Sequence, residues 1–411
     1  MGIEIRSVTA DEVGAFVSAD TTAFGSSATP AFIDAYRPGL ELDRTIAAFD
    51  GAQLVATAAT YSLEMTVPGG AQVPVGGLSW VGVLPTHRRR GLLREMMARH
   101  LDDTRDRGEP MGALFASEAV LYRRFGYGVA SFEARVEIDP RTITFLDDAA
   151  PVGTFTLIDR ETALTVLPPV HDRYRLRAVG EMQRAHHYWG SLFLELDDDV
   201  GGGHRPWFHV VHADALGDID GYALYRFADD TWEHGMSQMV VEVYEVIASD
   251  AAVRAELWRY LLRLDLVGTL KSEHTPIDEP LRWMVTDPRR LRTTSVIDAL
   301  WLRPIDLPRA LEARGYAAED ALVLDVIDPS RPDTNGTYAL DAGPEGAECR
   351  RTGAEADLRL DVPALASIYL GGVTVQRLAD AGRIQEVRRG AVARADALLR
   401  VDRQPFCGTA F

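Results

Sequence analysis

The sequence predicts a chain built from α/β and α+β domains, two or three in number. Its 411 residues exceed what one ordinary hydrophobic core holds together, so more than one folding unit is expected. Up to about Ile138, apolar strand-like runs alternate with helical patterns, which is typical of an α/β domain. Turn-forming and charged residues at 139–140 and 147–153 then interrupt both periodicities, and this interruption predicts a domain boundary.

Two further stretches mix strand and helix patterns after this boundary. We expect domains over residues 1–140, 154–300 and 301–411, the last of them of α+β type. The second and third domains are expected to contain strands at 221–227 and 240–247, helices at 251–264 and 308–314, and strands at 321–326 and 357–360. Gly315 is expected to end the helix at 308–314.

The charge balance bears on the choice of partners. The chain carries 43 lysines and arginines against 61 aspartates and glutamates, a net charge of −18, which repels nucleic-acid phosphates. We therefore expect no nucleic-acid partner. The same charge attracts cationic solutes such as amines, but it also serves solubility alone, so it favours an amine substrate only weakly.

The cysteines and histidines predict neither a disulfide framework nor a metal site. Cys349 and Cys407 are too few for a framework and fit a reducing compartment, with Cys407 an inert thiol. The histidines at 186–187, 204, 209 and 212 have no cysteine near them, so we expect them at the surface or on an edge strand and not bound to a metal. An exposed loop is expected at 197–203. Since the start lacks a basic leader and no apolar run is long enough to span a membrane, a cytoplasmic protein is expected.

The most informative stretch is a strand, a basic loop and a helix at 77–97. In the strand at 77–84, alternation would turn Leu78 and Trp80 to one face, and Val81 and Val83 to the other, until Pro85 ends it. After Gly91 the period becomes helical, and one apolar face is formed by Leu92, Leu93, Met96, Met97 and Leu101.

The basic loop therefore lies at a helix N-terminus. Free backbone N–H groups and the helix dipole favour an anion there, and Arg88 and Arg89 add positive charge. Gly91 would let the backbone approach a diphosphate closely, so the loop is a candidate pyrophosphate site. The arginine run alone fits a solvated basic turn equally well.

A second strand-to-helix step follows at 113–126. Residues 113–116 form an apolar strand, Ser117 suits a helix N-cap, and Gly126 stops a helix in which Tyr122 and Phe125 share a face. This places Tyr122 beside the strand predicted at 77–84. By itself Tyr122 fits a packing aromatic better than a catalytic one, because most tyrosines only pack.

Taken together, these segments resemble a known superfamily. The run Arg88-Arg89-Arg90-Gly91-Leu92-Leu93 resembles the acetyl-CoA loop of the GNAT acetyltransferases, Arg/Gln-x-x-Gly-x-Gly/Ala, and departs from it at Leu93. The wider resemblance, to the Eis (enhanced intracellular survival) branch, spans nearly the whole chain and rests on the segments at 83–93, 121–128, 302–303, 311–316 and 409–411.

The resemblance implies a domain plan. It implies tandem GNAT-like domains followed by a sterol-carrier-protein-like domain whose C-terminus enters the first domain's active site, and it implies a hexamer. It also implies that the second GNAT-like domain lacks a working cofactor loop. The segment at 287–290 agrees with this, since it has the charge of the motif but no glycine.

The resemblance also implies roles for individual residues. Acetyl-CoA contacts are expected at Val81, Val83, Arg88, Arg89, Gly91, Leu92 and Ser117. Tyr122 takes the general-acid position and the α-carboxylate of Phe411 the base position, while Phe24, Tyr36 and Trp80 line the acceptor pocket. Aminoglycoside-modifying members carry carboxylates where this chain has Ser26 and Ala410, so a polyamine or a lysine-type amine stays open beside an aminoglycoside.

These roles suit direct acetyl transfer. Phe411 can accept the amine's proton, backbone N–H near Val81 can steady the oxyanion, and Tyr122 can protonate the leaving sulfur, so no acyl-enzyme is required. Two other functions stay open. One is a lipid- or hydrophobe-binding protein that uses residues 305–411, and the other is a non-catalytic assembly protein.

Overall fold

The computed structural model describes residues 2–147, 152–197, 205–229 and 231–411, so the loop expected at 197–203 and His204 lie almost entirely outside the described residues. The chain forms two compact units. The first comprises residues 1–131, 179–183 and 298–411, and the second comprises 132–178 and 184–297.

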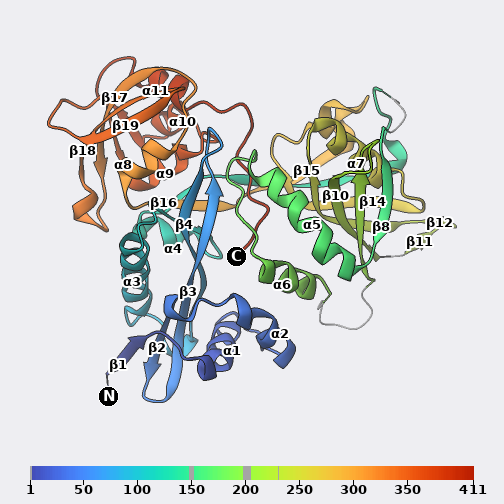
Figure 1. Ribbon diagram of the computed structural model, residues 1–411, viewed down its shortest axis with the longest axis horizontal. Helices are drawn as coiled ribbons and strands as arrows, with labels where there is room; N and C mark the ends of the chain where they lie inside the picture. Colours follow the sequence, from blue (N-terminus) through green and yellow to red (C-terminus); the bar gives the residue numbers. More distant parts are fainter. Residues whose placement is uncertain (1, 148–151, 198–204, 230) are drawn as a thin grey trace. The chain divides into compact units, whose positions relative to one another are not determined.

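The first unit contains a seven-stranded sheet in the order β1-β2-β3-β4-β5-β16-β6 (Figure 1). Its strands are β1 (Ile3–Arg6), β2 (Thr45–Asp50), β3 (Gln53–Thr66), β4 (Gln72–Val83), β5 (Met111–Phe115), β6 (Gly128–Val129) and β16 (Leu300–Pro304). β1 to β4 pair antiparallel in succession, β4 and β5 are parallel, and β16 is antiparallel to both β5 and β6. Residues near 300 therefore complete a sheet that otherwise comes from the start of the chain.

Helices cover both faces of this sheet. α3 (Leu92–Asp106) packs on one side, and α1 (Val13–Ala23) and α2 (Pro30–Tyr36) lie on the other (Figure 1). The apolar face predicted after Gly91 is confirmed, because the helix buries Leu92, Met96, Met97 and Leu101 and half-buries Leu93.

The second predicted helix is short. α4 (Ala119–Tyr122) continues as a 3-10 turn over Arg123–Phe125 and ends at Gly126, whose φ of 90° is the left-handed conformation that glycine favours. Because the chain stays extended through Glu118, that residue occupies the N-cap, and the prediction of Ser117 as N-cap is wrong by one position.

A β-bulge in β4 overturns the simple alternation predicted for this strand. Thr57 pairs with Gly82 and Ala59 with Ser79, so β4 holds one residue more than β3 over this step, and Trp80 adopts a φ of 56°. As a result Trp80 packs near Phe16 of α1, at 6.1 Å between ring centroids, whereas Val81 packs against the cluster that contains Leu78. The prediction that Leu78 and Trp80 share a face is therefore wrong.

The C-terminal domain is also part of the first unit. Its five-stranded sheet has the order β19-β18-β17-β20-β21 and consists of β17 (Asp320–Ile327), β18 (Gly336–Gly343), β19 (Gly346–Arg351), β20 (Leu358–Asp361) and β21 (Ile384–Glu386). Its helices are α8 (Leu307–Ala313), α9 (Val362–Tyr369), α10 (Val375–Asp380) and α11 (Ala391–Leu399). One hydrophobic cluster joins this domain to the first sheet, since Val75 and Met111 belong to the same cluster as Leu322 and Leu365.

The second unit is built on another seven-stranded sheet, in the order β15-β7-β14-β13-β10-β9-β8. Its strands are β7 (Phe132–Ile138), β8 (Thr154–Ile158), β9 (Trp207–Ala213), β10 (Ile219–Asp229), β13 (Met239–Ala248), β14 (Val267–Pro276) and β15 (Leu291–Asp298), with a hairpin of β11 (Trp232–Glu233) and β12 (Met236–Ser237). Its helices are α5 (Arg160–Arg175), α6 (His186–Asp197) and α7 (Ala251–Leu262). The strands and the helix predicted at 221–264 are confirmed within a few residues.

Two histidines of β9 differ from expectation. His209 and His212 were expected at a surface or an edge, but β9 lies between β8 and β10, so both side chains are buried. Asp220 and Glu256 contact the two ring nitrogens of His212. His186 and His187 are exposed, as expected. Within the described ranges, no group of three or more His, Cys, Asp or Glu residues is arranged to hold a metal ion.

The segment 179–183 belongs to the first unit although its neighbours in sequence belong to the second. It lies along β3, where Gly180 donates its N–H to the carbonyl of Thr66 at 2.8 Å and the N–H of Thr66 donates to the carbonyl of Glu181 at 3.0 Å.

No helix among the described residues has both the length and the apolar character needed to cross a bilayer.

Candidate active site

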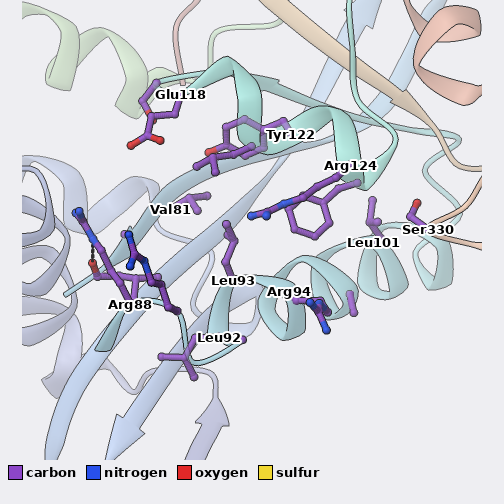
Figure 2. A pocket seen from close by; sticks show the side chains of 18 of the residues that line it. Val81, Arg88, Leu92, Leu93, Arg94, Leu101, Glu118, Tyr122, Arg124 and Ser330 are labelled. Carbon is purple, nitrogen blue, oxygen red and sulfur yellow. Dashed lines mark hydrogen bonds between the residues drawn. The ribbon is translucent and has the colours of Figure 1, made fainter. Parts of the chain in front are cut away.

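A pocket of about 1260 Å³ opens in the first unit between α3 and α4. Figure 2 shows Leu92, Leu93 and Arg94 from α3 on one side, and Glu118, Tyr122 and Arg124 on the other. Eight of the residues predicted for the cofactor site and for catalysis line this pocket, namely Val81, Val83, Arg88, Arg89, Gly91, Leu92, Ser117 and Tyr122.

The N-terminus of α3 forms the anion-binding end of the pocket. Gly91 is the N-cap with a φ of 85°, Arg89 has a φ of 63°, and the first helical hydrogen bond runs from Glu95 N–H to the Gly91 carbonyl at 3.2 Å. The N–H groups of the first turn therefore have no intrahelical acceptor and point toward the loop. The guanidinium of Arg88, which also lines the pocket, donates to the carbonyls of Val83 and Ala23 at 3.3 Å each, so it is held at the ends of β4 and α1.

The charge of the lining is opposite to that of the whole chain. Arginines line the pocket at positions 88, 89, 94, 124 and 331, against carboxylates only at 102, 118 and 333. Since the protein as a whole has a net charge of −18, this local excess of guanidinium groups favours a polyanion such as a diphosphate in the pocket.

β4 and β5 diverge beside the pocket. Their parallel pairing covers only Val75 to Gly77 against Met111 to Ala113. Beyond Gly77, β4 continues through Val81 and Val83, which line the pocket, and keeps its pairing only with β3. The opposite edge of β4 is thus open for hydrogen bonds to an extended ligand.

Tyr122 is a buried phenol in the pocket wall. Its side chain is 4% exposed, and burial raises the pKa of its phenol above the ordinary value, while a hydrogen bond with Ser117 lowers it. The hydroxyl is therefore protonated at neutral pH and able to donate. Its ring lies 6.3 Å from that of Tyr127, in an edge-to-face arrangement.

Phe411 lies where the pairing of β4 and β5 ends. Its ring packs edge-to-face on Phe115, with 5.4 Å between centroids, and it is so close to Gly77 that a Cβ there would come within 2.9 Å of it. The last residue of the chain is thus four residues along β4 from Val81 of the pocket lining. Figure 1 shows the C-terminus beside these strands.

Of the residues predicted for the acceptor pocket, Phe24, Tyr36 and Trp80, two are in contact with each other. Tyr36 and Trp80 pack edge-to-face at 5.2 Å, and Trp80 Nε1 donates to the Tyr61 hydroxyl at 2.6 Å. Phe24 is 58% exposed and lies on the rim of the pocket that contains Arg88.

Several residues of this region were missed by the sequence analysis. Asp20 of α1 is buried near the bulge, where Thr57 donates to it, and burial raises its pKa to about 6. The far end of the pocket is lined by residues 329–333 of the C-terminal domain, where Arg331 pairs with Asp102 at 3.0 Å. The sequence around Asp20 and around residues 329–333 has no pattern that predicts this placement, because it depends on contacts between distant parts of the chain.

A buried ion pair supports this far end. Arg303 of β16 donates to Asp328 at 2.6 Å, and neither side chain is exposed to solvent. The other oxygen of Asp328 accepts from the backbone N–H groups of Ser330 and Arg331. The pair therefore fixes the loop that lines the pocket.

Models of known domain families match three stretches of the chain. Acetyltransferase (GNAT) domain models match residues 4–130 and 180–304, and a sterol carrier protein domain model matches residues 307–408. The predicted architecture of tandem GNAT domains followed by a sterol-carrier-like domain is confirmed. The protein is an acetyltransferase, and its GNAT fold implies acetyl-CoA as co-substrate and an amine as acceptor.

Full-length relatives then give the family. An uncharacterized N-acetyltransferase of Streptomyces griseus is 36% identical over 100% of both chains, and the N-acetyltransferase Eis of Mycobacterium tuberculosis is 34% identical over 98% of both. The crystal structure of Eis1 from Mycobacterium abscessus superposes with a TM-score of 0.89 at 34% identity and covers 99% of this chain and 100% of its own. This chain belongs to the Eis family of N-acetyltransferases.

Proposed function

We propose that the protein transfers the acetyl group of acetyl-CoA directly to a primary amine in a ternary complex. One observation carries the proposal. The arginine-rich pocket at the N-terminus of α3 combines a protonated, buried Tyr122 with an open edge of β4, and the chain's own carboxyl-terminal residue contacts the same strand at Gly77. These are the groups that acetyl transfer to an amine requires.

Each group has a defined task in this proposal. The α-carboxylate of Phe411 takes a proton from the acceptor, which leaves a neutral amine. The amine nitrogen then bonds to the acetyl carbon, and backbone N–H near Val81 steadies the oxyanion until the carbon–sulfur bond breaks. The nitrogen loses its surplus proton to water. Tyr122 gives its proton to the leaving sulfur. Arg88, Arg89, Gly91 and Leu92 would hold the diphosphate, with Val83 and Ser117 along the rest of the cofactor.

The acceptor is proposed to be a polyamine, a lysine-type side chain or an aminoglycoside. The aromatic pair Tyr36 and Trp80 offers faces to an alkylammonium group, and the chain's net charge of −18 attracts cations. The cytoplasmic location, predicted from the sequence, and the hexamer, implied by the family resemblance, are further parts of the proposal. The native mass in light scattering tests the hexamer.

The experiment is thiol release from acetyl-CoA by the purified protein, with a panel of polyamines, aminoglycosides and lysine peptides. We expect turnover with at least one amine and its collapse in Tyr122→Phe. Tyr316→Phe is a matched control, because that buried hydroxyl bonds to Leu311 in the C-terminal domain. Absence of thiol release with every amine would contradict the proposal.

The role of the terminal carboxylate needs its own variant. A single glycine appended after Phe411 keeps the phenyl ring but moves the carboxylate by about 3.5 Å along the chain. We expect this variant to lose activity about as completely as deletion of Phe411. Full activity after the extension would exclude the α-carboxylate as the base.

A further inference from the structure

Glu181 is a fully buried carboxylate outside the pocket, with 0% of its surface exposed. It lies in the segment 179–183, which returns to the first unit from the second. A buried carboxylate is costly unless hydrogen bonds satisfy it, so its partners indicate what it does.

The carboxylate of Glu181 accepts from the N–H of its neighbour Met182, at 3.0 Å to Oε1, and from residues near the end of the chain. Its Oε2 accepts from the backbone N–H of Gly408 at 2.9 Å, and its Oε1 accepts from the Thr409 hydroxyl at 2.5 Å. The thiol of Cys407 lies 3.9 Å from the same Oε1. Both carboxylate oxygens are thus engaged by three consecutive residues of the tail.

The backbone around Glu181 is itself fixed. Thr66 of β3 donates to the Glu181 carbonyl at 3.0 Å, and Gln183 donates to the Glu64 carbonyl at 2.9 Å. On the other side of the segment, Phe406 of the tail donates to Val179 at 3.0 Å. The segment 179–183 therefore lies between β3 and the tail and is hydrogen-bonded to both.

The tail would not hold its position without such contacts. Residues 402–411 contain no helix or strand, and a chain end of this kind frays unless it is tied down. Phe411 follows Thr409 by only two residues, so the clamp at Gly408 and Thr409 restricts where its carboxylate can lie.

We propose that Glu181 is a positioning residue, which clamps the tail so that the α-carboxylate of Phe411 stays at the acceptor amine. This inference rests on the proposed function, in which that carboxylate is the base. A charged acceptor suits the task, because hydrogen bonds to a carboxylate are shorter and stronger than those to a neutral amide. Glutamine at 181 would keep the size of the side chain but leave one of the two tail donors without an acceptor.

The first experiment compares Glu181→Gln with Glu345→Gln, an exposed control in the C-terminal domain. Carboxypeptidase release of the terminal phenylalanine measures how firmly the tail is held, whatever the chemistry. We expect release about tenfold faster or more in Glu181→Gln, a kcat lower by about tenfold or more, and a KM for acetyl-CoA within about twofold of wild type. Release and kcat equal to those of Glu345→Gln would overturn the proposal.

A double variant separates this inference from the proposed function. If Glu181 acts through the terminal residue, Glu181→Gln combined with deletion of Phe411 is no slower than the deletion alone. Additive losses would overturn the positioning role. If deletion of Phe411 leaves kcat unchanged, the proposed base is wrong, and carboxypeptidase release then tests the clamp alone.

Thr409→Val is a milder second variant, in case Glu181→Gln fails to fold. It removes one donor to Glu181 and leaves the Gly408 bond in place. We expect faster release of the terminal phenylalanine and a lower kcat, in the same direction as Glu181→Gln but smaller. An unchanged rate of release would contradict the clamp.

Discussion

Gly77→Ala is the most direct test of whether the terminal residue must fit closely against β4. Gly77 is the last residue of β4 that pairs with β5, and the Phe411 ring lies against it. A Cβ at this position would come within 2.5 Å of Leu63 Cδ1 and within 2.9 Å of Phe411 Cε2. Ordinary van der Waals contact begins at 3.4 Å, so the side chain of Leu63 must retreat by about 0.9 Å and the Phe411 ring by about 0.5 Å.

This displacement sets the expected magnitude. Misplacement of a catalytic group by about 1 Å costs about 100-fold in rate, so a shift of half that size predicts a kcat about tenfold lower. Overpacking should also cost about 1–3 kcal/mol of the free energy of unfolding. The KM for acetyl-CoA should change little, because Gly77 is not among the residues that line the pocket.

The assay is thiol release at saturating amine, together with a urea denaturation curve. Gly14→Ala is the matched control, because it makes the same change inside α1 where no atom lies within 4 Å of the new methyl group, and its kcat should equal that of the wild type. A folded Gly77→Ala protein with wild-type kcat would refute the reasoning, since the terminal residue would then tolerate the shift.

Four further predictions follow from single residues. Tyr122→Phe should lower kcat about 100-fold or more in the thiol-release assay and leave the KM for acetyl-CoA unchanged; an active variant would remove the proposed acid. Arg88→Gln should raise the dissociation constant of coenzyme A about tenfold in calorimetry, and an unchanged constant would show that this guanidinium does not bind the diphosphate. Burial, and then Arg44, lowers the pKa of His100 to about 3. Between about pH 6.5 and 3, the imidazole is therefore protonated in the unfolded state but neutral in the folded state. The free energy of unfolding in urea should be about 2 kcal/mol lower at pH 5 than at pH 7, and His100→Gln should lose this pH dependence. Burial instead raises the pKa of Asp20 from 3.8 to about 6, so the wild type loses stability as the pH rises from about 4 to 6. Asp20→Asn should therefore be more stable than wild type by about 3 kcal/mol at pH 8 but not at pH 3 in urea denaturation.

The parts of the site that depend on local pattern could be predicted from the sequence. The change from strand to helical periodicity after Gly91 predicts α3 and its buried face, and the basic loop before it predicts an anion site. The role of Phe411 came only from family resemblance, because a terminal phenylalanine has no local pattern that distinguishes a base from a frayed end.

The remainder depends on contacts that no local pattern encodes. The bulge gives Trp80 a positive φ. This conformation is uncommon for residues other than glycine, so it could not be predicted from a tryptophan in the sequence. Glu181 is one acidic residue in a short segment without periodicity, and its importance arises from the tail, more than two hundred residues later in the chain. The pairing of β16 with β5 likewise joins distant parts of the chain.

That last pairing has a consequence for biosynthesis. β5 ends at Phe115 and β16 begins at Leu300, so about 185 residues are synthesised before β5 receives its antiparallel neighbour. At about 5–20 residues per second, the outer edge of β5 waits roughly 10–40 s on the ribosome without its partner. An apolar strand with an open edge is a template for wrong pairing, so a nascent chain in this interval is a substrate for chaperones, and a fragment that stops near residue 140 should aggregate.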